Sequence, residues 1–323
     1  MEVNINLNES YKNKVILVTG GAGFVGTNLV KKLANFDVKK IIVLDNLFTG
    51  RLENIENIKK VEFIHGDIEN YDLVRDIVKE CDIIFHLAAR NIIVSTKDPY
   101  LDFKTNVYGT FNILEASRYS KIERLVYASS VSVYGNALYL PINEKDLLYP
   151  LNPYAASKIS SESYCNTYYE TYGVPVTILR YSNVYGPYQT PLNPYCGVIS
   201  KFITNALNGA PLQIHGDGEQ TRDFTYVEDV VDATLLAGIN NKAIGETFNI
   251  ATGVEITINQ LADVILKITN SSSPIEYVDK RDIDNVRRRV LNIEHARRIL
   301  RWTPKITLLE GIKRTIQWIR EMK

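Results

Sequence analysis

The chain has 323 residues, of which 45% are apolar, so it can form one large domain or two with a substantial core. Lys plus Arg and Asp plus Glu both count 37, so the formal charge is zero. That balance gives no electrostatic reason to expect nucleic acid or an anionic membrane as a partner. Any acidic ligand must therefore be bound by local groups.

The N-terminal and cysteine patterns argue against export and metal binding. Residues 1–13 are polar and lack the apolar segment of a signal peptide, so we expect a frayed extension. No stretch approaches the ~20 apolar residues of a membrane span. Cys81, Cys165 and Cys196 are too few for a disulfide framework and lack metal-site spacing. We expect a cytoplasmic protein with reduced thiols and no metal.

The first half of the chain alternates apolar runs with helical patterns. The runs predict buried strands at residues 15–18, 41–44, 61–64, 83–87, 125–128 and 176–179. The helical patterns include residues 27–33, 107–117 and 157–169. This alternation predicts the α/β class, with a Rossmann-type, doubly wound parallel sheet over residues 1–180.

The second half has a different sequence pattern. Residues 185–195 are rich in Pro, Tyr and Asn and are predicted to form a loop. A strand pattern at 247–250 is expected to return to the main sheet. Helical patterns occur at residues 200–207, 259–267, 294–300 and 309–322. We predict a smaller α+β lobe over residues 181–323, interleaved with the first domain through a return segment of about 224–251.

The first functional motif is the glycine-rich turn GGAGFVG at residues 20–26, which follows a predicted strand and opens a predicted helix. In that context Gly20 allows a tight turn, and Gly23 lets the backbone approach a pyrophosphate. Gly26 lets the helix pack close to the strand, and the free N–H groups at the helix start attract phosphate. The motif therefore predicts a dinucleotide site.

An acidic residue ends each of the next two predicted strands. Asp45 lies ~20 residues past the glycine turn, where a carboxylate accepts hydrogen bonds from a ribose 2′-hydroxyl. Because a carboxylate there repels a 2′-phosphate, NAD is favoured over NADP. Asp67 is expected near the adenine, although an ordinary turn aspartate would fit the same pattern.

The second functional motif is Tyr154 with Lys158, four residues apart and therefore on one face of a helix. A tyrosine hydroxyl, with a pKa near ~10, is a poor base until a nearby ammonium lowers that pKa. Such a pair can remove the proton of an alcohol while hydride leaves the same carbon. Ser129 and Ser130 follow the fifth predicted strand, and one of these hydroxyls is expected to bridge the reacting oxygen to Tyr154.

These motifs occur together with further segments that are typical of one family. The chain resembles the extended short-chain dehydrogenase/reductases, in the nucleotide-sugar epimerase/dehydratase branch, over nearly its whole length. The segments that carry the resemblance are TGGAGFVG (19–26), DNLFTG (45–50), GDI (66–68), HLAA (86–89), ASSVSVYG (128–135), PYAASK (153–158), LRYSNVYGP (179–187), GDGEQTRDFTYVEDV (216–230) and WTPKITLLEGIKRTIQW (302–318).

The resemblance implies roles for individual residues. Ser130, Tyr154 and Lys158 would be catalytic, Asn106 would support Lys158, and Tyr181 would flank the nicotinamide. The residues expected to bind NAD are Gly20, Gly23, Phe24, Val25, Gly26, Asp45, Asn46, Phe48, Thr49, Gly50, Asp67, Ile68, Leu87, Ala88, Ala89, Asn106, Tyr154, Lys158 and Tyr181.

The same resemblance places a nucleotide-sugar substrate in the second lobe. Asn183 and Arg222 match diphosphate-binding positions, and arginine suits phosphate because its planar fork gives paired hydrogen bonds. The segment after HLAA, which is one residue shorter than usual, would line the sugar pocket. The remaining substrate residues implied are Ser95 and Ser130 for the sugar, Val198, Gln213 and His215 for the base, and Arg287 among several late arginines for the phosphates.

The positions after Ser130 discriminate among reactions. The resemblance implies that dehydratases of the family have an Asp-Glu pair just after this hydroxyl. Here Val131 and Ser132 occupy those positions. Neither side chain can do the proton transfers of an elimination. The resemblance therefore implies a 4-epimerase of the UDP-glucose/UDP-galactose type, in which C4 is oxidised by NAD and then reduced from the other face.

Alternative functions stay open at the level of sequence. They are an epimerase of another sugar nucleotide (UDP-GlcNAc, UDP-GlcA, or a CDP- or TDP-sugar), an NAD(P)-dependent sugar reductase, and an NAD-sensing scaffold without catalysis. A bulky Arg289 and the lack of an arginine near Thr190 favour plain hexoses. The family also implies a homodimer through helices at 107–117 and 157–169, with Tyr164, Tyr168 and Tyr169 as anchors or as ordinary core residues.

Overall fold

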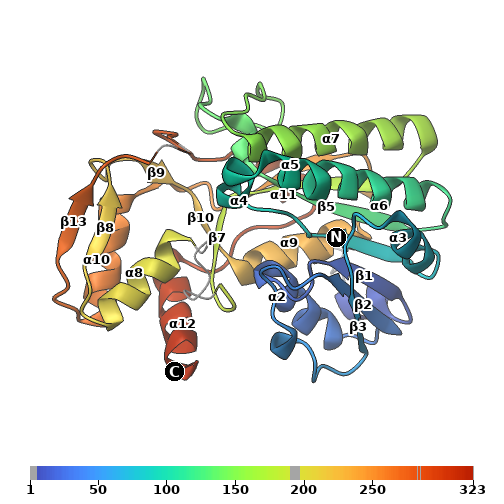
Figure 1. The fold of residues 1–323 in the computed structure, drawn as a ribbon, viewed down its shortest axis with the longest axis horizontal. Helices are drawn as coiled ribbons and strands as arrows, with labels where there is room; N and C mark the ends of the chain where they lie inside the picture. The colour runs from blue at the N-terminus through green and yellow to red at the C-terminus, as the bar shows by residue number, and fades with distance from the viewer. Residues whose placement is uncertain (1–5, 190–196, 282, 284, 323) are drawn as a thin grey trace.

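A seven-stranded parallel sheet forms the centre of the computed structural model, which describes residues 6–189, 197–281, 283 and 285–322 (Figure 1). The strand order is β11-β6-β5-β4-β1-β2-β3. The strands are β1 (Val15–Thr19), β2 (Lys40–Asp45), β3 (Val61–His65), β4 (Ile83–His86), β5 (Arg124–Ser130), β6 (Val176–Tyr181) and β11 (Thr247–Ile250). The predicted Rossmann-type sheet is confirmed, and the strand at 247–250 joins its edge beside β6.

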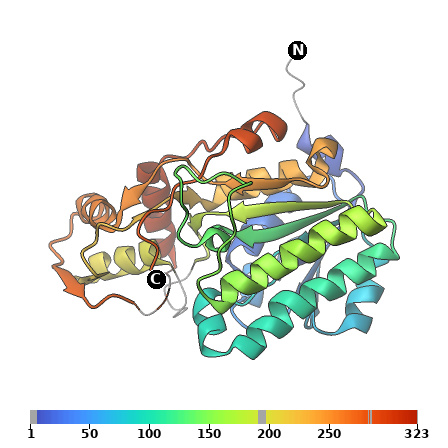
Figure 2. The same cartoon turned by 90° about the horizontal axis from the view of Figure 1, so that it is seen from above.

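Helices cover both faces of the sheet, and side chains along each strand alternate between two cores. Ile16 and Val18 of β1 point into the core on the side of α2 and α9, whereas Leu17 points into the core on the side of α3, α6 and α7. Figures 1 and 2 show α6 and α7 lying side by side over one face. These helices are α2 (Phe24–Ala34), α3 (Tyr71–Val78), α6 (Gly109–Arg118), α7 (Pro153–Tyr172) and α9 (Val227–Ile239).

The second lobe has a core of its own, at the other end of the molecule in Figure 1. Its strands form three small pairs: β13 with β8, β10 with β7, and β12 with β9. The strands are β7 (Asn183–Tyr185), β8 (Leu212–His215), β9 (Thr221–Arg222), β10 (Phe224–Tyr226), β12 (Ile256–Thr257) and β13 (Ile275–Val278). The helices packed around them are α8 (Val198–Leu207), α10 (Ile258–Thr269) and α12 (Leu308–Glu321).

Short helical segments complete the described part of the chain, several of them beside the sheet. They are α1 (Leu7–Tyr11), η1 (Leu52–Asn54), α4 (Ile92–Lys97), α5 (Pro99–Asp102), the π-helical η2 (Phe103–Tyr108), η3 (Val131–Tyr134), η4 (Asn241–Ala243) and α11 (Glu294–Ile299). Segment η2 runs directly into α6, so the helix predicted from residue 107 begins within a wider π-helical turn.

The helix that carries Tyr154 starts earlier than its apolar pattern predicts. The pattern places its start at residue 157, but α7 begins at Pro153. Asn152 caps it, because its side-chain oxygen accepts a hydrogen bond from the Ala155 N–H, and proline is favoured at the first helical position. The helix ends at Gly173, whose φ of 71° is the left-handed conformation that glycine adopts easily.

The expectation of a frayed N-terminus is wrong for residues 7–11, which form α1. Tyr11 is fully buried, its ring stacks on Phe36 at 5.7 Å between centroids, and its hydroxyl donates to the Leu235 carbonyl at 2.7 Å. The contact with α9 crosses more than two hundred residues of sequence. The local sequence is polar and does not predict this contact, which is made by the aromatic residue Tyr11.

Other predictions concern single side chains. Cys81 and Cys165 are buried free thiols, and burial raises the pKa of Cys81 to about 12. Tyr168 is a core residue whose hydroxyl donates to Glu115, whereas Tyr164 is 42% exposed on α7. The positions of Thr190 and Cys196 lie outside the described residues.

Candidate active site

The glycine turn connects β1 to α2 at the carboxyl edge of the sheet. Gly20 has a φ of 69°, and a Cβ on it would lie 2.9 Å from the Ala88 backbone. A Cβ on Gly26 would lie 2.2 Å from the Gly20 carbonyl oxygen, far inside contact distance. The turn is therefore closed to side chains at these positions, so a pyrophosphate can approach its backbone closely.

The end of β2 lies beside this turn. Asp45 is 8% exposed, and its carboxylate accepts hydrogen bonds from the N–H groups of Ala22, at 3.0 Å, and Leu47, at 2.8 Å. Burial raises its pKa, and those two bonds lower it. Each carboxylate oxygen keeps a further lone pair that a ribose hydroxyl could use.

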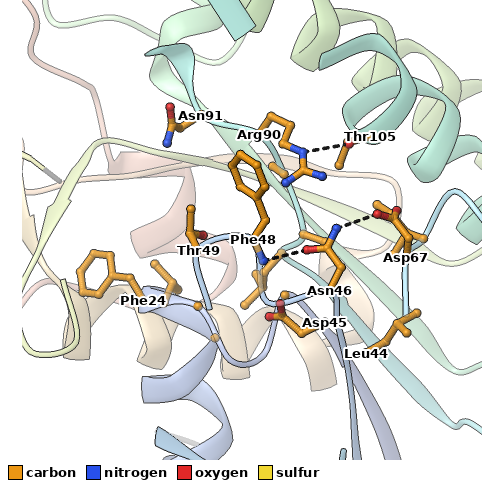
Figure 3. A pocket seen from close by; sticks show the side chains of 18 of the residues that line it. Phe24, Leu44, Asp45, Asn46, Phe48, Thr49, Asp67, Arg90, Asn91 and Thr105 are labelled. Carbon is orange, nitrogen blue, oxygen red and sulfur yellow. Dashed lines mark hydrogen bonds between the residues drawn. The ribbon is translucent and has the colours of Figure 1, made fainter. Parts of the chain in front are cut away.

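A cavity of about 360 Å³ opens over these residues (Figure 3). Most of the predicted cofactor residues line it: Gly20, Gly23, Phe24, Val25, Gly26, Asp45, Asn46, Phe48, Thr49, Asp67, Ile68, Leu87, Ala88, Ala89 and Tyr154. Gly50, Asn106, Lys158 and Tyr181 are not among its lining residues. The Asn46 amide donates to Asp67 at 2.6 Å, which joins the ends of β2 and β3 across the cavity floor.

Tyr181 and Gly50 have packing roles beside the cavity. Tyr181, at the end of β6, directs its hydroxyl to Thr234 of α9, with the oxygens 2.7 Å apart. A Cβ on Gly50 would lie 3.0 Å from both Ala22 and the Asp45 carboxylate, so this position needs glycine for the approach of the two loops.

The cavity has lining residues that were not predicted for the cofactor, among them Thr105, Tyr188 and Gln189. Arg90 also lines it, although the segment after HLAA was expected to line the sugar pocket. The Arg90 guanidinium carbon lies 3.9 Å from the centre of the Phe48 ring, and its Nε donates to Thr105 at 3.1 Å (Figure 3). Arg90 directly follows the HLAA segment, so its place in sequence was the available signal. Tyr188 and Gln189 come from the loop after β7, whose sequence carries no recognised signal.

Tyr154 and Lys158 lie on the first turns of α7, facing the end of β5. The Lys158 ammonium donates to the Ala128 carbonyl at 2.8 Å and lies 5.9 Å from the centre of the Tyr154 ring. Ser129 and Ser130 point differently: the buried Ser129 hydroxyl donates to Glu162 at 2.5 Å, whereas the Ser130 hydroxyl accepts from the Ser132 N–H. Of the two serines, Ser130 is the one that hydrogen-bonds Tyr154.

Burial is the largest influence on the pKa values of Tyr154 and Lys158. It raises the pKa of Tyr154 to about 12, although the hydrogen bond with Ser130 lowers it. The expected lowering of the Tyr154 pKa by Lys158 is not found among the protein groups alone, where burial raises this pKa and Ser130 is the group that lowers it. Burial lowers the pKa of Lys158 to about 8, against the opposing pull of Asp102 and Glu162. The lysine can therefore carry its charge at neutral pH.

A buried hydrogen-bonded cluster lies behind the pair. The Asp102 carboxylate accepts bonds from Ser95 at 2.5 Å, Asn106 at 2.6 Å and Ser157 at 3.1 Å. Asn106 thus reaches Ser157, which precedes Lys158, and no hydrogen bond joins it to Lys158 among the described residues. Ser95 is fully buried, so its hydroxyl faces Asp102 and not the cavity.

The predicted diphosphate residues lie together in the second lobe. The Asn183 main-chain N–H donates to the Asp223 carbonyl next to Arg222, because β7 and β10 pair there. The buried Asn183 side-chain oxygen has no hydrogen-bond partner among the described residues. One nitrogen of Arg222 donates to the carbonyls of Thr221 and Val286.

The predicted base-binding residues come from neighbouring elements. Val198 starts α8, while Gln213 and His215 lie on β8, where His215 bonds the Asp279 carbonyl at 2.9 Å. Arg287 is exposed and pairs with Asp217 at 2.7 Å. Ser95, Ser130, Asn183, Val198, Gln213, His215, Arg222 and Arg287 are not among the lining residues of the cavity that Figure 3 shows.

The fold and this site define a class: an α/β enzyme that holds a dinucleotide at the carboxyl edge of a parallel sheet, with Tyr and Lys beside it. The comparison with family models gives the particular family. Residues 16–251 match the NAD dependent epimerase/dehydratase family, and the chain belongs to it. NAD is its cofactor, and the closed glycine turn with Asp45 at the end of β2 fits that group.

Known relatives agree on the family and differ in reaction. A Methanocaldococcus jannaschii protein, provisionally named a UDP-glucose 4-epimerase, is 44% identical over 311 residues, with 95% of this chain and 98% of the relative covered. The bovine dTDP-D-glucose 4,6-dehydratase is 37% identical over 324 residues, with 95% and 89% covered. The Thermotoga maritima UDP-glucose 4-epimerase, solved with UDP-glucose, superposes with a TM-score of 0.90 at 36% identity, covering 95% of this chain and 99% of that one.

Among residues 6–189, 197–281, 283 and 285–322, no helix is both long and apolar enough to cross a bilayer.

Proposed function

We propose that the protein is a nucleotide-sugar 4-epimerase of the UDP-glucose/UDP-galactose type. The observation that carries the proposal is the set of side chains where β5 meets α7. Ser130, Tyr154 and Lys158 gather there, and the two residues after Ser130 are Val131, which is buried, and Ser132. A site with this minimal set suits reversible oxidation of an alcohol and lacks carboxyl groups at the positions where the family's dehydratases have them.

The positions of these groups support a role for each of them. Tyr154 is the base that takes the proton of the C4 hydroxyl and later returns it. The Ser130 hydroxyl shares a hydrogen bond with Tyr154 and bridges it to the sugar oxygen. The Lys158 ammonium stabilises the phenolate that forms in the buried site. NAD, when bound, supplies the acceptor and donor for the C4 hydride.

The second lobe would hold the nucleotide diphosphate. A guanidinium such as that of Arg222 suits phosphate oxygens, and the unpartnered Asn183 oxygen would accept a hydrogen bond from a ligand hydroxyl. We place the lobe boundary near residue 180, with residues 224–251 returning to the NAD-binding domain. Val198, Gln213, His215 and Arg287 would surround the base and phosphates.

The bovine relative makes a 4,6-dehydratase the nearest alternative. Elimination requires an acid and a base besides Tyr154. In the short helix η3 (Val131–Tyr134) no side chain carries a carboxyl group. The alternative therefore lacks proton-transfer groups in the place where relatives of that activity carry them.

The test is a substrate panel. Purified protein is incubated separately with UDP-glucose, UDP-GlcNAc, UDP-GlcA and dTDP-glucose, and the products are separated by anion-exchange chromatography. UDP-galactose formed from UDP-glucose supports the proposal. A 4-keto-6-deoxy product from dTDP-glucose, with UDP-glucose unchanged, would establish the dehydratase in its place.

We further propose that the protein forms a homodimer through α6 and α7, which lie side by side at the surface (Figure 2). Exposed aromatic side chains on this face support the proposal, including Tyr108 at 43%, Tyr164 at 42% and Tyr172 at 45% exposure. Sedimentation velocity should give twice the chain mass, and Tyr164→Asp should reduce it to one chain. A single-chain mass for the unmodified protein would refute the dimer.

A further inference from the structure

The charge of Lys158 lacks a close ionic partner. The side chain is 3% exposed, and its nitrogen makes one hydrogen bond, to the Ala128 carbonyl. Within the described residues no carboxylate lies within 4.0 Å of that nitrogen. A buried ammonium without an ion pair is costly unless other groups stabilise the positive charge.

The aromatic ring of Tyr127 is the other group close to this nitrogen. The Lys158 nitrogen lies 4.8 Å from the centre of the Tyr127 ring, within the range of a cation–π contact. Tyr127 is 1% exposed on β5, and its side chain points to the same core as α7. The ring is thus fixed beneath the ammonium by the sheet.

The hydroxyl of Tyr127 does not explain why an aromatic residue occupies this position of β5. It is buried and has no hydrogen-bond partner among the described residues. The neighbouring Ser161 hydroxyl shares its proton between the carbonyls of Asn106 and Ser157, and it opposes the effect of burial, which raises the pKa of Tyr127. The ring, and not the hydroxyl, is the part of Tyr127 that lies against the Lys158 ammonium.

We propose that the face of the Tyr127 ring stabilises the Lys158 ammonium and so keeps the lysine charged beside Tyr154. Tyr127 is then a positioning residue that acts through Lys158. The catalytic importance of that lysine rests on the proposed function. A cation–π contact that is shielded from water is worth more than an exposed one, which suits this location.

The other titratable groups around Lys158 are engaged elsewhere or uncharged. On α7, Glu162 pairs with Arg180, and burial raises the pKa of the Cys165 thiol so that it stays neutral. On α5, Asp102 accepts its three hydrogen bonds from Ser95, Asn106 and Ser157.

On β4, His86 bonds the hydroxyls of Thr19 and Thr110, and burial lowers its pKa to about 3, so it adds no positive charge. Tyr154 stays protonated in the protein alone because burial raises its pKa. Among the described residues, the Tyr127 ring at 4.8 Å is therefore the group that adds negative potential to that of the Ala128 carbonyl at 2.8 Å.

The test measures the titration of Lys158 directly, in protein loaded with NAD. Lysine labelled with ¹³C at Cε is incorporated, the Lys158 resonance is assigned by its loss in Lys158→Met, and its shift is followed against pH. Tyr127→Leu, which removes the ring, should lower the proton affinity of Lys158 about tenfold, which is about one pKa unit. Tyr127→Phe, which keeps the ring, should change it less than about twofold.

Phe85→Leu is the matched control, because it removes a fully buried ring from β4 on the opposite face of the sheet. It should leave the Lys158 titration unchanged while lowering stability. Tyr127→Met is measured in the same way, so that a second variant without the ring is available if Tyr127→Leu does not fold.

An unchanged titration in a folded ring-less variant overturns the proposal. So does a Tyr127→Phe shift as large as that of Tyr127→Leu, because the hydroxyl would then be responsible. The titration uses no sugar nucleotide, so it remains valid if the protein acts on a different substrate. Failure of the substrate panel and failure of this proposal can therefore be told apart.

Discussion

Arg180 and Glu162 form a buried ion pair directly behind the strand that carries Ser130. A terminal nitrogen of Arg180 lies 2.6 Å from a Glu162 oxygen, and the side chains are 6% and 3% exposed. Ser129 donates to the same carboxylate, and Arg180 also donates to the Tyr134 hydroxyl at 2.8 Å. The pair thus ties β5, β6 and α7 together at the position where the catalytic groups meet.

Glu162→Gln should cost about 3 kcal/mol of unfolding free energy, because it leaves the Arg180 charge buried without its counter-charge. Glu294→Gln is the control, since its pair with Arg297 is exposed and should contribute less than about 1 kcal/mol. Urea denaturation of both variants measures the difference. Equal losses would show that the buried pair is no more important than a surface pair.

Gly26→Ala should weaken NAD binding. The new Cβ would lie 2.2 Å from the Gly20 carbonyl oxygen, so the turn must open where it meets the pyrophosphate. We expect NAD affinity to fall by a factor of about ten or more, equivalent to about 1.4 kcal/mol. Calorimetric titration with NAD measures it.

Gly209→Ala is the comparison for that experiment. Gly209 has a φ of 69° but nothing within 4 Å of an added Cβ, and it lies in the second lobe after α8. It should lose about 1 kcal/mol of stability from backbone strain and keep its NAD affinity. Equal affinities for the two variants would contradict the role of Gly26.

Tyr154→Phe should lower kcat by a factor of about 10² to 10⁴ and leave NAD binding intact. The phenyl ring fills the same space, and only the proton-transfer group is lost. Tyr164→Phe, an exposed position on the same helix, should have no effect on rate. Steady-state kinetics on the best substrate of the panel decide this, and a Tyr154→Phe variant of normal kcat would exclude Tyr154 as the base.

Lys158 links stability to pH. Burial lowers its pKa to about 8, whereas a lysine in an unfolded chain titrates near ~10.4. Between these values the unfolded chain binds a proton that the folded chain has released, so the contribution of this group to unfolding free energy rises with pH. The lysine is charged in both states below this window and neutral in both states above it.

Urea titrations of the wild type and Lys158→Met at several pH values isolate that contribution. The stability of the wild type relative to the variant should increase between about pH 8 and about pH 10. A relative stability that is flat or decreasing across this window would mean that the folded-state pKa of Lys158 is not lowered.

The Rossmann-type sheet could be predicted because its signals are local. The inner strands β1 and β2 are buried on both faces, so residues 15–18 and 41–44 are continuously apolar, whereas the edge strand β3 is partly exposed. The glycine turn has a fixed place between strand and helix. The cofactor site followed from the same signals. Residues such as Asp45 end strands whose carboxyl edge is the binding edge.

The remaining features depend on contacts that the local sequence does not show. Strands β9 and β12 are only two residues long and have no periodicity to detect. Tyr11 is ordered by α9, and Ser95 is turned to Asp102 by the packing of α4 against α5 and α7. The Arg90 contact with Phe48 joins two loops, and the sequence of neither loop predicts that the two side chains meet.

The central claim is that hydride leaves C4 of the sugar and returns to the same carbon within one active site. UDP-galactose carrying deuterium at C4 should be converted to UDP-glucose, without added NAD, and mass spectrometry should find the deuterium retained at C4. Loss of the label to solvent would contradict the account. So would absence of conversion by protein whose ultraviolet absorbance shows bound NAD.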